Sequence, residues 1–375
     1  MFIPPHCPNP DCSHYAPPQS PHWFRKKGFY RTKTFGRIPR FRCSACSTSF
    51  SRQTFSLDYY AKRLLDYSYI YRQINAGAGI RNIARDLNVR EKAITNRINR
   101  MARNATLISQ AIIKHLPFDE DLVLDGLQNF CVSQYFPDNY TILVGKDSQF
   151  VYECDYATLR RSGRMRPDQK KRRAELEKRF TPSRKAVEHS FARLLVQVGR
   201  MRKVRLLPLI LYTDEKKDYQ RVLWNHRENR QRMFSGQWRH HMTSSEVSRN
   251  NQNPLFSVNY IDREIRKDMA SQSRETVQFP RNVSNAMLRM NLYLYDHNVR
   301  KPYRVADREK KRVRHAQVAG LGKSDLEALA EGFFRKRVFR SKDLELSPSA
   351  RMTLDRRWVT PLKEGEEKVW KYMAA

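Results

Sequence analysis

The chain has 375 residues, of which 72 are Lys or Arg and 38 are Asp or Glu, so its formal net charge is +34. An excess of positive charge this large indicates a polyanionic partner, and nucleic acid is the partner that we expect. No run of 18 apolar residues is present, which argues against a membrane-spanning helix. The first residues lack the charged and apolar regions of a signal peptide. We therefore expect a cytoplasmic, nucleoid-associated protein whose cysteines stay reduced.

Composition divides the chain into four segments. Residues 1–56 are rich in Pro, Cys, Arg and aromatic residues, and residues 57–116 have helical periodicity. Residues 117–304 mix strand-like and helix-like runs, and residues 305–375 form a basic C-terminal extension. Within the third segment, residues 160–179 are dense in charge, which predicts an exposed loop or a solvated helix.

Four of the six cysteines stand in two close pairs. Four residues separate Cys7 from Cys12, and two residues separate Cys43 from Cys46. Two close thiolate pairs suit a tetrahedral zinc ion. The short alternating runs between the pairs are typical of the hairpins of a zinc ribbon. A segment this small has little core of its own, so metal binding would supply much of its folding free energy.

The run from Ile70 to Ala105 predicts three helices. Two apolar stripes at helical spacing are separated by Asn88, where one helix ends. A short helix, a break and a basic helix together predict a helix-turn-helix, with a helical linker as the alternative. The candidate recognition helix begins near Arg90. The residues that we expect to face outward and contact DNA are Arg90, Lys92, Thr95, Asn96, Arg97 and Arg100.

The third segment has the order of elements found in an RNase H-like fold. Three strand-like runs joined by short turns predict an antiparallel meander, and a helix-like run precedes a fourth strand. We therefore expect an α/β domain with a mixed sheet and flanking helices. The expected strands are residues 122–132, 140–146, 150–156 and 206–212, and the expected helix is residues 185–201.

Three aspartates fall where such a domain would bind a divalent metal. Asp125 lies within the first strand, and Asp214 follows the fourth. The third acid should come from a later helix, where Asp262 borders the apolar stripe and Glu264 points farther from it. Asp262 is therefore preferred, with Glu264 as the alternative. Three carboxylates would bind two Mg²⁺ or Mn²⁺ ions, because oxygen ligands select such hard cations. For each acid, an ordinary role as a turn residue, helix cap or exposed charge is the alternative.

With these motifs, the chain resembles a group of bacterial insertion-sequence transposases. In that group, an N-terminal zinc ribbon and a helix-turn-helix precede an acidic-triad (DDE/DDD) catalytic domain. The resemblance covers residues 5–304. The motifs that carry it are the four cysteines, IRNIARDLNV, LVLDG, LYTDE and VNYIDREIR. Asn259-Tyr-Ile-Asp262 matches the family's Asn-x-x-Glu pattern, with Asp in place of Glu.

The resemblance implies an enzyme that recognises the ends of a DNA element, cuts the DNA and joins it to a target. It also implies double-stranded DNA as the partner and a homodimer or larger assembly on that DNA. Two other functions fit the same residues. One is a zinc-containing DNA-binding regulator that descends from a transposase and has no catalysis. The other is an RNase H-like nuclease that cleaves DNA without joining it.

Overall fold

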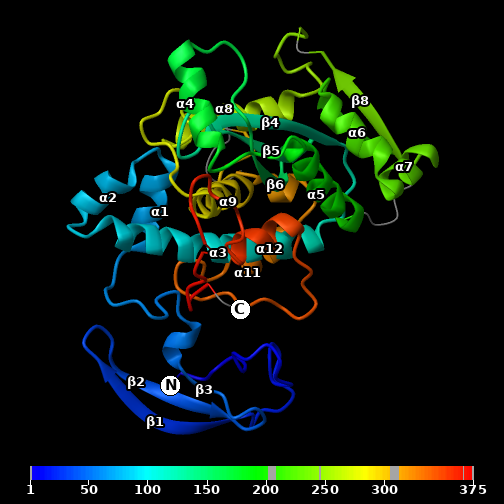
Figure 1. The fold of residues 1–375 in the computed structure, drawn as a ribbon. Helices are drawn as coiled ribbons and strands as arrows, with labels where there is room; N and C mark the ends of the chain where they lie inside the picture. The colour runs from blue at the N-terminus through cyan, green and yellow to red at the C-terminus, as the bar shows by residue number, and fades with distance from the viewer. Residues whose placement is uncertain (1, 202–207, 245, 305–311, 366, 374–375) are drawn as a thin grey trace.

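The computed structural model describes residues 2–201, 208–244, 246–304, 312–365 and 367–373. Over these residues the chain has an α/β fold with a three-stranded antiparallel sheet and a five-stranded mixed sheet. Figure 1 shows the small sheet set apart from the larger sheet, with the long helix α3 (Glu91–His115) between them. Among the helices of these ranges, none has both the length and the apolar character to cross a bilayer.

The small sheet forms the N-terminal module. It comprises β1 (Phe24–Thr32), β2 (Gly36–Cys43) and β3 (Ser49–Ser51), and the 3₁₀ helix η1 (Arg52–Phe55) follows. Most side chains of β1 are exposed, so the module has a small core. That core combines Trp23, Phe41 and Phe50 with the cysteines of the two pairs. Its small size agrees with a need for metal binding.

Three helices follow the small sheet: α1 (Tyr67–Asn75), α2 (Ile80–Asp86) and α3. The Asp66 carboxylate caps α1 by accepting hydrogen bonds from the backbone N–H groups of Ser68 and Tyr69, at 2.8 and 3.1 Å. Asn88 adopts a left-handed backbone conformation with φ of 47° in the break between α2 and α3. The 25-residue helix α3 then packs along α9 (Val283–Val299).

The larger sheet has the strand order β6-β5-β4-β7-β8. The first three strands form an antiparallel meander, whereas β7 pairs parallel to β4 and β8 pairs parallel to β7. The expectation of an α/β fold with a mixed sheet is therefore confirmed. The strands are β4 (Leu122–Phe130), β5 (Pro137–Gly145), β6 (Val151–Thr158), β7 (Leu209–Asp214) and β8 (Trp238–Thr243). Residues 206 and 207, at the start of the expected fourth strand, lie outside the described residues.

Helices cover both faces of this sheet. Side chains alternate along β4, so Leu122 and Leu124 join one apolar cluster and Val123 joins another. The first cluster includes α3, α5 (Ala186–Met201) and α6 (Lys217–Asn225), and the second includes α8 (Phe256–Asp268). Helix α9 contributes to both. Two surface helices complete this part of the chain: α4 (Pro167–Glu177), within the charged stretch, and α7 (Arg227–Phe234).

The C-terminal extension packs on the rest of the molecule. It contains α10 (His315–Val318), α11 (Lys323–Ala330) and α12 (Pro348–Leu354), and α11 and α12 contact α3. Between these two helices the chain reaches the N-terminal module, where Ser56 and Lys336 form a β-bridge. The Leu57 N–H donates to the Arg335 carbonyl at 2.9 Å. The extension therefore connects the small sheet to the helical and sheet layers.

Candidate functional site

The four N-terminal cysteines converge on one point. The Sγ atoms of Cys7 and Cys46 are 3.5 Å apart, and those of Cys12 and Cys43 are 3.7 Å apart. All four sulfur atoms lie within 4.8 Å of one another. Ligands about 2.3 Å from a tetrahedral zinc ion have sulfur atoms about 3.8 Å apart. The cluster can therefore bind a structural zinc ion.

Two of the expected acidic residues meet at the ends of adjacent strands. β4 and β7 are paired in parallel, with Leu122 opposite Leu211. Asp125 and Asp214 each lie three residues beyond this pair, so the same register brings them side by side. The Lys216 ammonium forms salt bridges with both carboxylates, with Nζ 3.2 Å from Asp125 Oδ1 and 2.9 Å from Asp214 Oδ2.

Asp262 approaches the same place from α8, which packs on the face of β4 and β5. Its Oδ1 atom is buried and has no hydrogen-bond partner. Burial, and then the negative charge of Asp125, raise the pKa of the Asp262 carboxyl to about 8, although the cations Arg266, Lys216 and Arg249 act in the opposite direction. An unpartnered carboxylate oxygen beside a second carboxylate is an arrangement that a hard cation would satisfy.

The alternative acid, Glu264, points elsewhere. It pairs with Lys267 at 2.6 Å and with Lys301 at 3.5 Å. Asp268 lies in the same group, where it accepts a hydrogen bond from the Tyr293 hydroxyl at 3.0 Å. Of the two candidate third acids, the structure therefore brings Asp262, and not Glu264, to Asp125.

A cavity of about 500 Å³ opens beside Asp125 and Asp262. Its walls carry Arg249, Arg266 and Arg274, and Asp125 and Asp262 are its only acidic lining residues among the described residues. Guanidinium groups bind phosphate oxygens with matched geometry. The cavity therefore combines two acids that can bind a metal with cations that can bind a phosphate.

The three aspartates do not form a closed metal site in this conformation. Within the described ranges, the only group of three or more His, Cys, Asp or Glu ligand atoms that lie within 4.8 Å of one another is the four cysteines. Lys216 stands where Asp125 and Asp214 would share a cation. A metal at these two carboxylates would therefore have to displace the ammonium group. Sequence reasoning missed Lys216, and its one available signal was a lysine two residues after Asp214.

The expected DNA-contacting residues of α3 divide into two groups. Arg90 and Lys92 are exposed, and Thr95 and Asn96 are partly buried. The expectation that Arg97 and Arg100 face outward is wrong, because only 4% and 3% of their surfaces are exposed. The two guanidinium groups donate instead to backbone carbonyls of the segment before α1, Arg97 to Arg63 and Arg100 to Leu57 at 2.8 Å.

The start of α3 lies in a recess that we call the α3 groove. It is a cavity of about 850 Å³ bounded by the segment before α1, by α3 and by the C-terminal residues. Residues 277–282 border a separate cavity on another side of α3. The polar positions of the expected recognition helix therefore do not stand out from the surface. The α3 groove is lined by Tyr60, Ala61, Lys62, Arg63, Arg90, Lys92, Ala93, Thr95, Asn96, Arg97, Asn99, Asn285, Arg356, Trp370 and Tyr372.

Comparison with known proteins adds no family. No protein-family model and no curated protein matches this chain.

Proposed function

We propose that this protein is a DNA transposase whose catalytic domain is RNase H-like, with Asp125, Asp214 and Asp262 as the metal ligands. The observation that carries the proposal is the meeting of these acids: two come from adjacent parallel strands and one from a packed helix. The order β6-β5-β4-β7-β8, antiparallel through β4 and parallel beyond it, supports the RNase H-like assignment. The resemblance of the motifs to insertion-sequence transposases supports strand transfer in particular.

Each group at the site has a defined task in this proposal. Bound Mg²⁺ or Mn²⁺ would lower the pKa of the attacking water or 3′-hydroxyl and stabilise the leaving oxygen. Asp125 and Asp214 present their carboxylates from the rigid sheet, and Asp262 supplies its unpartnered oxygen from α8. Arg249 and Arg266 hold the backbone phosphate in the adjacent cavity. Lys216 withdraws from the two aspartates when the cation is bound.

The N-terminal module supports DNA as the substrate. No Asp or Glu occurs between Asp11 and Asp58, whereas Lys and Arg recur through β1 and β2. An exposed sheet of positive charge attracts the phosphate backbone without reading sequence. We propose that this module binds the double-stranded ends of the element, and that the protein acts on them as a homodimer or larger assembly.

The direct test is strand cleavage and joining on DNA that carries the ends of the protein's own element, with Mg²⁺ or Mn²⁺. We expect Asp125→Asn, Asp214→Asn and Asp262→Asn each to lower the rate by more than about 100-fold, because even groups that only support a metal ligand are worth about 10- to 100-fold. Glu264→Gln is the matched control and should retain activity, because Glu264 pairs with Lys267 and Lys301. Cleavage without joining would identify a nuclease instead.

One observation favours the second candidate, a zinc-containing DNA-binding regulator. The Lys216 ammonium already pairs with both Asp125 and Asp214, as it would in a catalytic fold retained only as a scaffold. Specific DNA binding by a wild-type protein that never cuts, with the aspartate variants indistinguishable from it, would establish the regulator.

A further inference from the structure

The α3 groove is separate from the proposed catalytic site. In the part of the chain that the structure describes, no residue lines both the groove and the cavity beside Asp125 and Asp262. Most of its lining comes from three segments distant in sequence: the Tyr60–Arg63 stretch before α1, the first turns of α3, and the C-terminal residues Trp370 and Tyr372. The proposed catalytic chemistry does not use the residues that line this groove.

Among the described residues, every charged side chain that lines the α3 groove is a cation. Two of the six are engaged within the protein, since Arg97 donates to the Arg63 carbonyl and Arg356 pairs with Glu367 at 2.6 Å. The other four, Lys62, Arg63, Arg90 and Lys92, are exposed. A recess whose described lining carries cations from two segments and no acid fits a chain of phosphates.

Two aromatic rings in the groove are open to solvent. Tyr60 is 58% exposed and Trp370 is 38% exposed. Lysines lie over both rings: Lys371 Nζ is 5.4 Å from the Tyr60 centroid, and Lys368 and Lys92 Nζ are 5.5 and 5.9 Å from that of Trp370. Cation–π contacts at exposed sites are weak. A planar, uncharged ring such as a nucleic-acid base could therefore stack on each aromatic ring in place of the ammonium groups. The displaced lysines could then pair with a phosphate.

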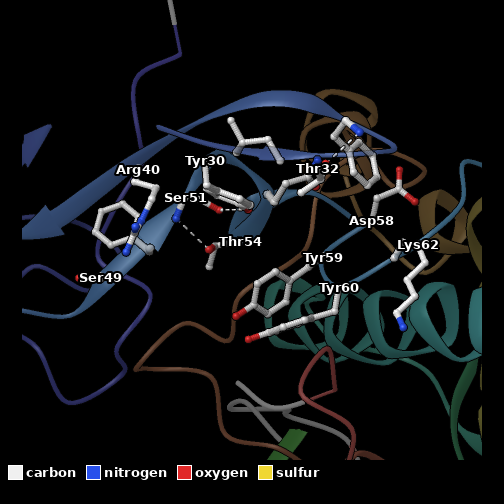
Figure 2. Close-up of a pocket in the computed structure, with 15 residues that line it drawn as sticks. Tyr30, Thr32, Arg40, Ser49, Ser51, Thr54, Asp58, Tyr59, Tyr60 and Lys62 are labelled. Atoms are coloured by element: carbon white, nitrogen blue, oxygen red, sulfur yellow. Dashed lines mark hydrogen bonds between the residues drawn. The ribbon is translucent and has the colours of Figure 1, made fainter. Parts of the chain in front are cut away.

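The backbone of Tyr60 is held in an uncommon conformation. Its φ of 60° is in the left-handed region, which a bulky side chain enters only at a cost in energy. This conformation places the rings of Tyr59 and Tyr60 with centroids 4.4 Å apart. Figure 2 shows the two rings side by side on the segment that also borders a second cavity, of about 410 Å³, beneath the small sheet. The fold thus maintains a strained residue whose ring is mostly in solvent.

We propose that the α3 groove binds an unpaired strand of DNA, with bases stacked on Tyr60 and Trp370 and phosphates held by Lys62, Arg63, Arg90 and Lys92. In a duplex, the base faces are covered by neighbouring base pairs, so exposed aromatic faces suit unpaired bases. To enter the major groove of a duplex, α3 would also have to protrude, whereas its start is recessed. That the strand is DNA and not RNA rests on the proposed function, because cutting and joining DNA expose unpaired DNA ends.

The test measures binding alone. Fluorescence anisotropy of a labelled oligothymidine of about 12 nucleotides would be titrated with the full-length protein, without added divalent metal. We expect Tyr60→Leu and Trp370→Leu each to raise the Kd by roughly five- to a hundredfold. The slope of log K against log salt should not change. Lys92→Gln should instead reduce that slope by about 0.7, the value for one lost contact with a single strand.

Trp224→Leu is the matched control, because Trp224 is 42% exposed and lies outside the α3 groove. The proposal is overturned if the wild type does not bind the oligothymidine, or if the control weakens binding as much as Trp370→Leu. It is also overturned if an RNA strand or a duplex of equal length binds at least as tightly and is equally sensitive to the two substitutions. Because the assay contains no catalytic metal, a protein that binds as expected but never cuts DNA would contradict the proposed function alone.

Discussion

At the scale of single residues, the ammonium group of Lys216 determines the state of the candidate catalytic site. Its side chain is 30% exposed, and those of Asp125 and Asp214 are 20% and 24% exposed, so solvent only partly screens the three charges. Two carboxylates that share a fixed cation have less to gain from a divalent ion. In the proposed function, Lys216 would therefore compete with the metal for Asp125 and Asp214.

We predict that Lys216→Gln binds Mn²⁺ on the order of tenfold more tightly than the wild type, because the metal must displace the ammonium group from two partly exposed ion pairs, each worth up to about 1 kcal/mol. Isothermal titration calorimetry with Mn²⁺ measures this directly. Lys217→Gln is the control, since Lys217 is exposed and is the next residue in the chain. Unchanged or weaker Mn²⁺ binding by Lys216→Gln would show that the ammonium group does not occupy the metal's position.

A second residue-scale feature is a buried pair of stacked histidines, His297 on α9 and His315 on α10. Their ring centroids are 3.9 Å apart, and each ring contacts a backbone carbonyl of the turn between β5 and β6, at Gln149 and Ser148. Burial lowers the pKa of His315 from 6.5 to about 4, and Lys301 acts in the same direction. The folded protein therefore holds this ring neutral over a range of pH in which the unfolded chain protonates it.

The buried His315 makes the stability of the folded protein depend on pH. The unfolded state binds more protons between pH 6.5 and 4, so the contribution of His315 to stability is present above pH 6.5 and is lost as the pH falls towards 4. We predict that the free energy of unfolding falls by about 3 kcal/mol more in the wild type than in His315→Gln over this range. Urea denaturation at several pH values measures the difference. His189→Gln, at an exposed position on α5, should behave as the wild type.

Some site residues could be predicted from sequence and others could not. Asp125 and Asp214 stand in apolar strand-like runs, where a carboxylate is costly without a partner, so local pattern alone singled them out. Asp262 could be preferred to Glu264 because helix geometry places Asp262 at the border of the apolar stripe and turns Glu264 farther away from it. Lys216 could not be found in this way. Its contact with Asp125 spans 91 residues and exists only because β7 pairs with β4.

At the scale of secondary-structure elements, α3 shows where periodicity stops being informative. A helical wheel separates an apolar face from a polar face, and it predicts that the polar face meets solvent. Here the segment before α1 and the C-terminal residues cover that face, so Arg100 is buried and its guanidinium lies 4.1 Å from the Tyr372 ring centroid. The strands of the meander were predictable to within three residues, because their pattern depends on neighbours close in sequence.

The N-terminal module is the element whose folding we expect to depend most on a ligand. Its aromatic core is completed by Phe339 from the C-terminal extension, and the Lys342 ammonium donates to the Cys12 carbonyl at 3.0 Å. We predict that removing zinc deprotects both β1–β3 and residues 335–342 in hydrogen–deuterium exchange, while β4 and α5 keep their protection. Restored protection after zinc is added back is the control. Equal protection with and without the metal would contradict a structural zinc site.

At the scale of the whole molecule, the excess positive charge is unevenly distributed. Helix α4 carries many cations, but it also contains acids, and Glu177 pairs with Arg160 at 2.7 Å. The small sheet has no acid to balance Lys27, Arg31 and Arg37, which are exposed. Phosphate contacts should therefore concentrate on the small sheet, although both segments look equally basic in the sequence.

Salt dependence separates these two surfaces. Each phosphate contact with duplex DNA contributes about 0.9 to the slope of log K against log salt, because binding releases a condensed counterion. We predict that Lys27→Gln, Arg31→Gln and Arg37→Gln each reduce the slope by up to about this amount, measured by anisotropy on a duplex between about 50 and 200 mM salt. Lys170→Gln on α4 is the control and should leave the slope unchanged. The reverse pattern would place the duplex on α4, and a wild-type affinity that is flat across this range would refute electrostatic binding altogether.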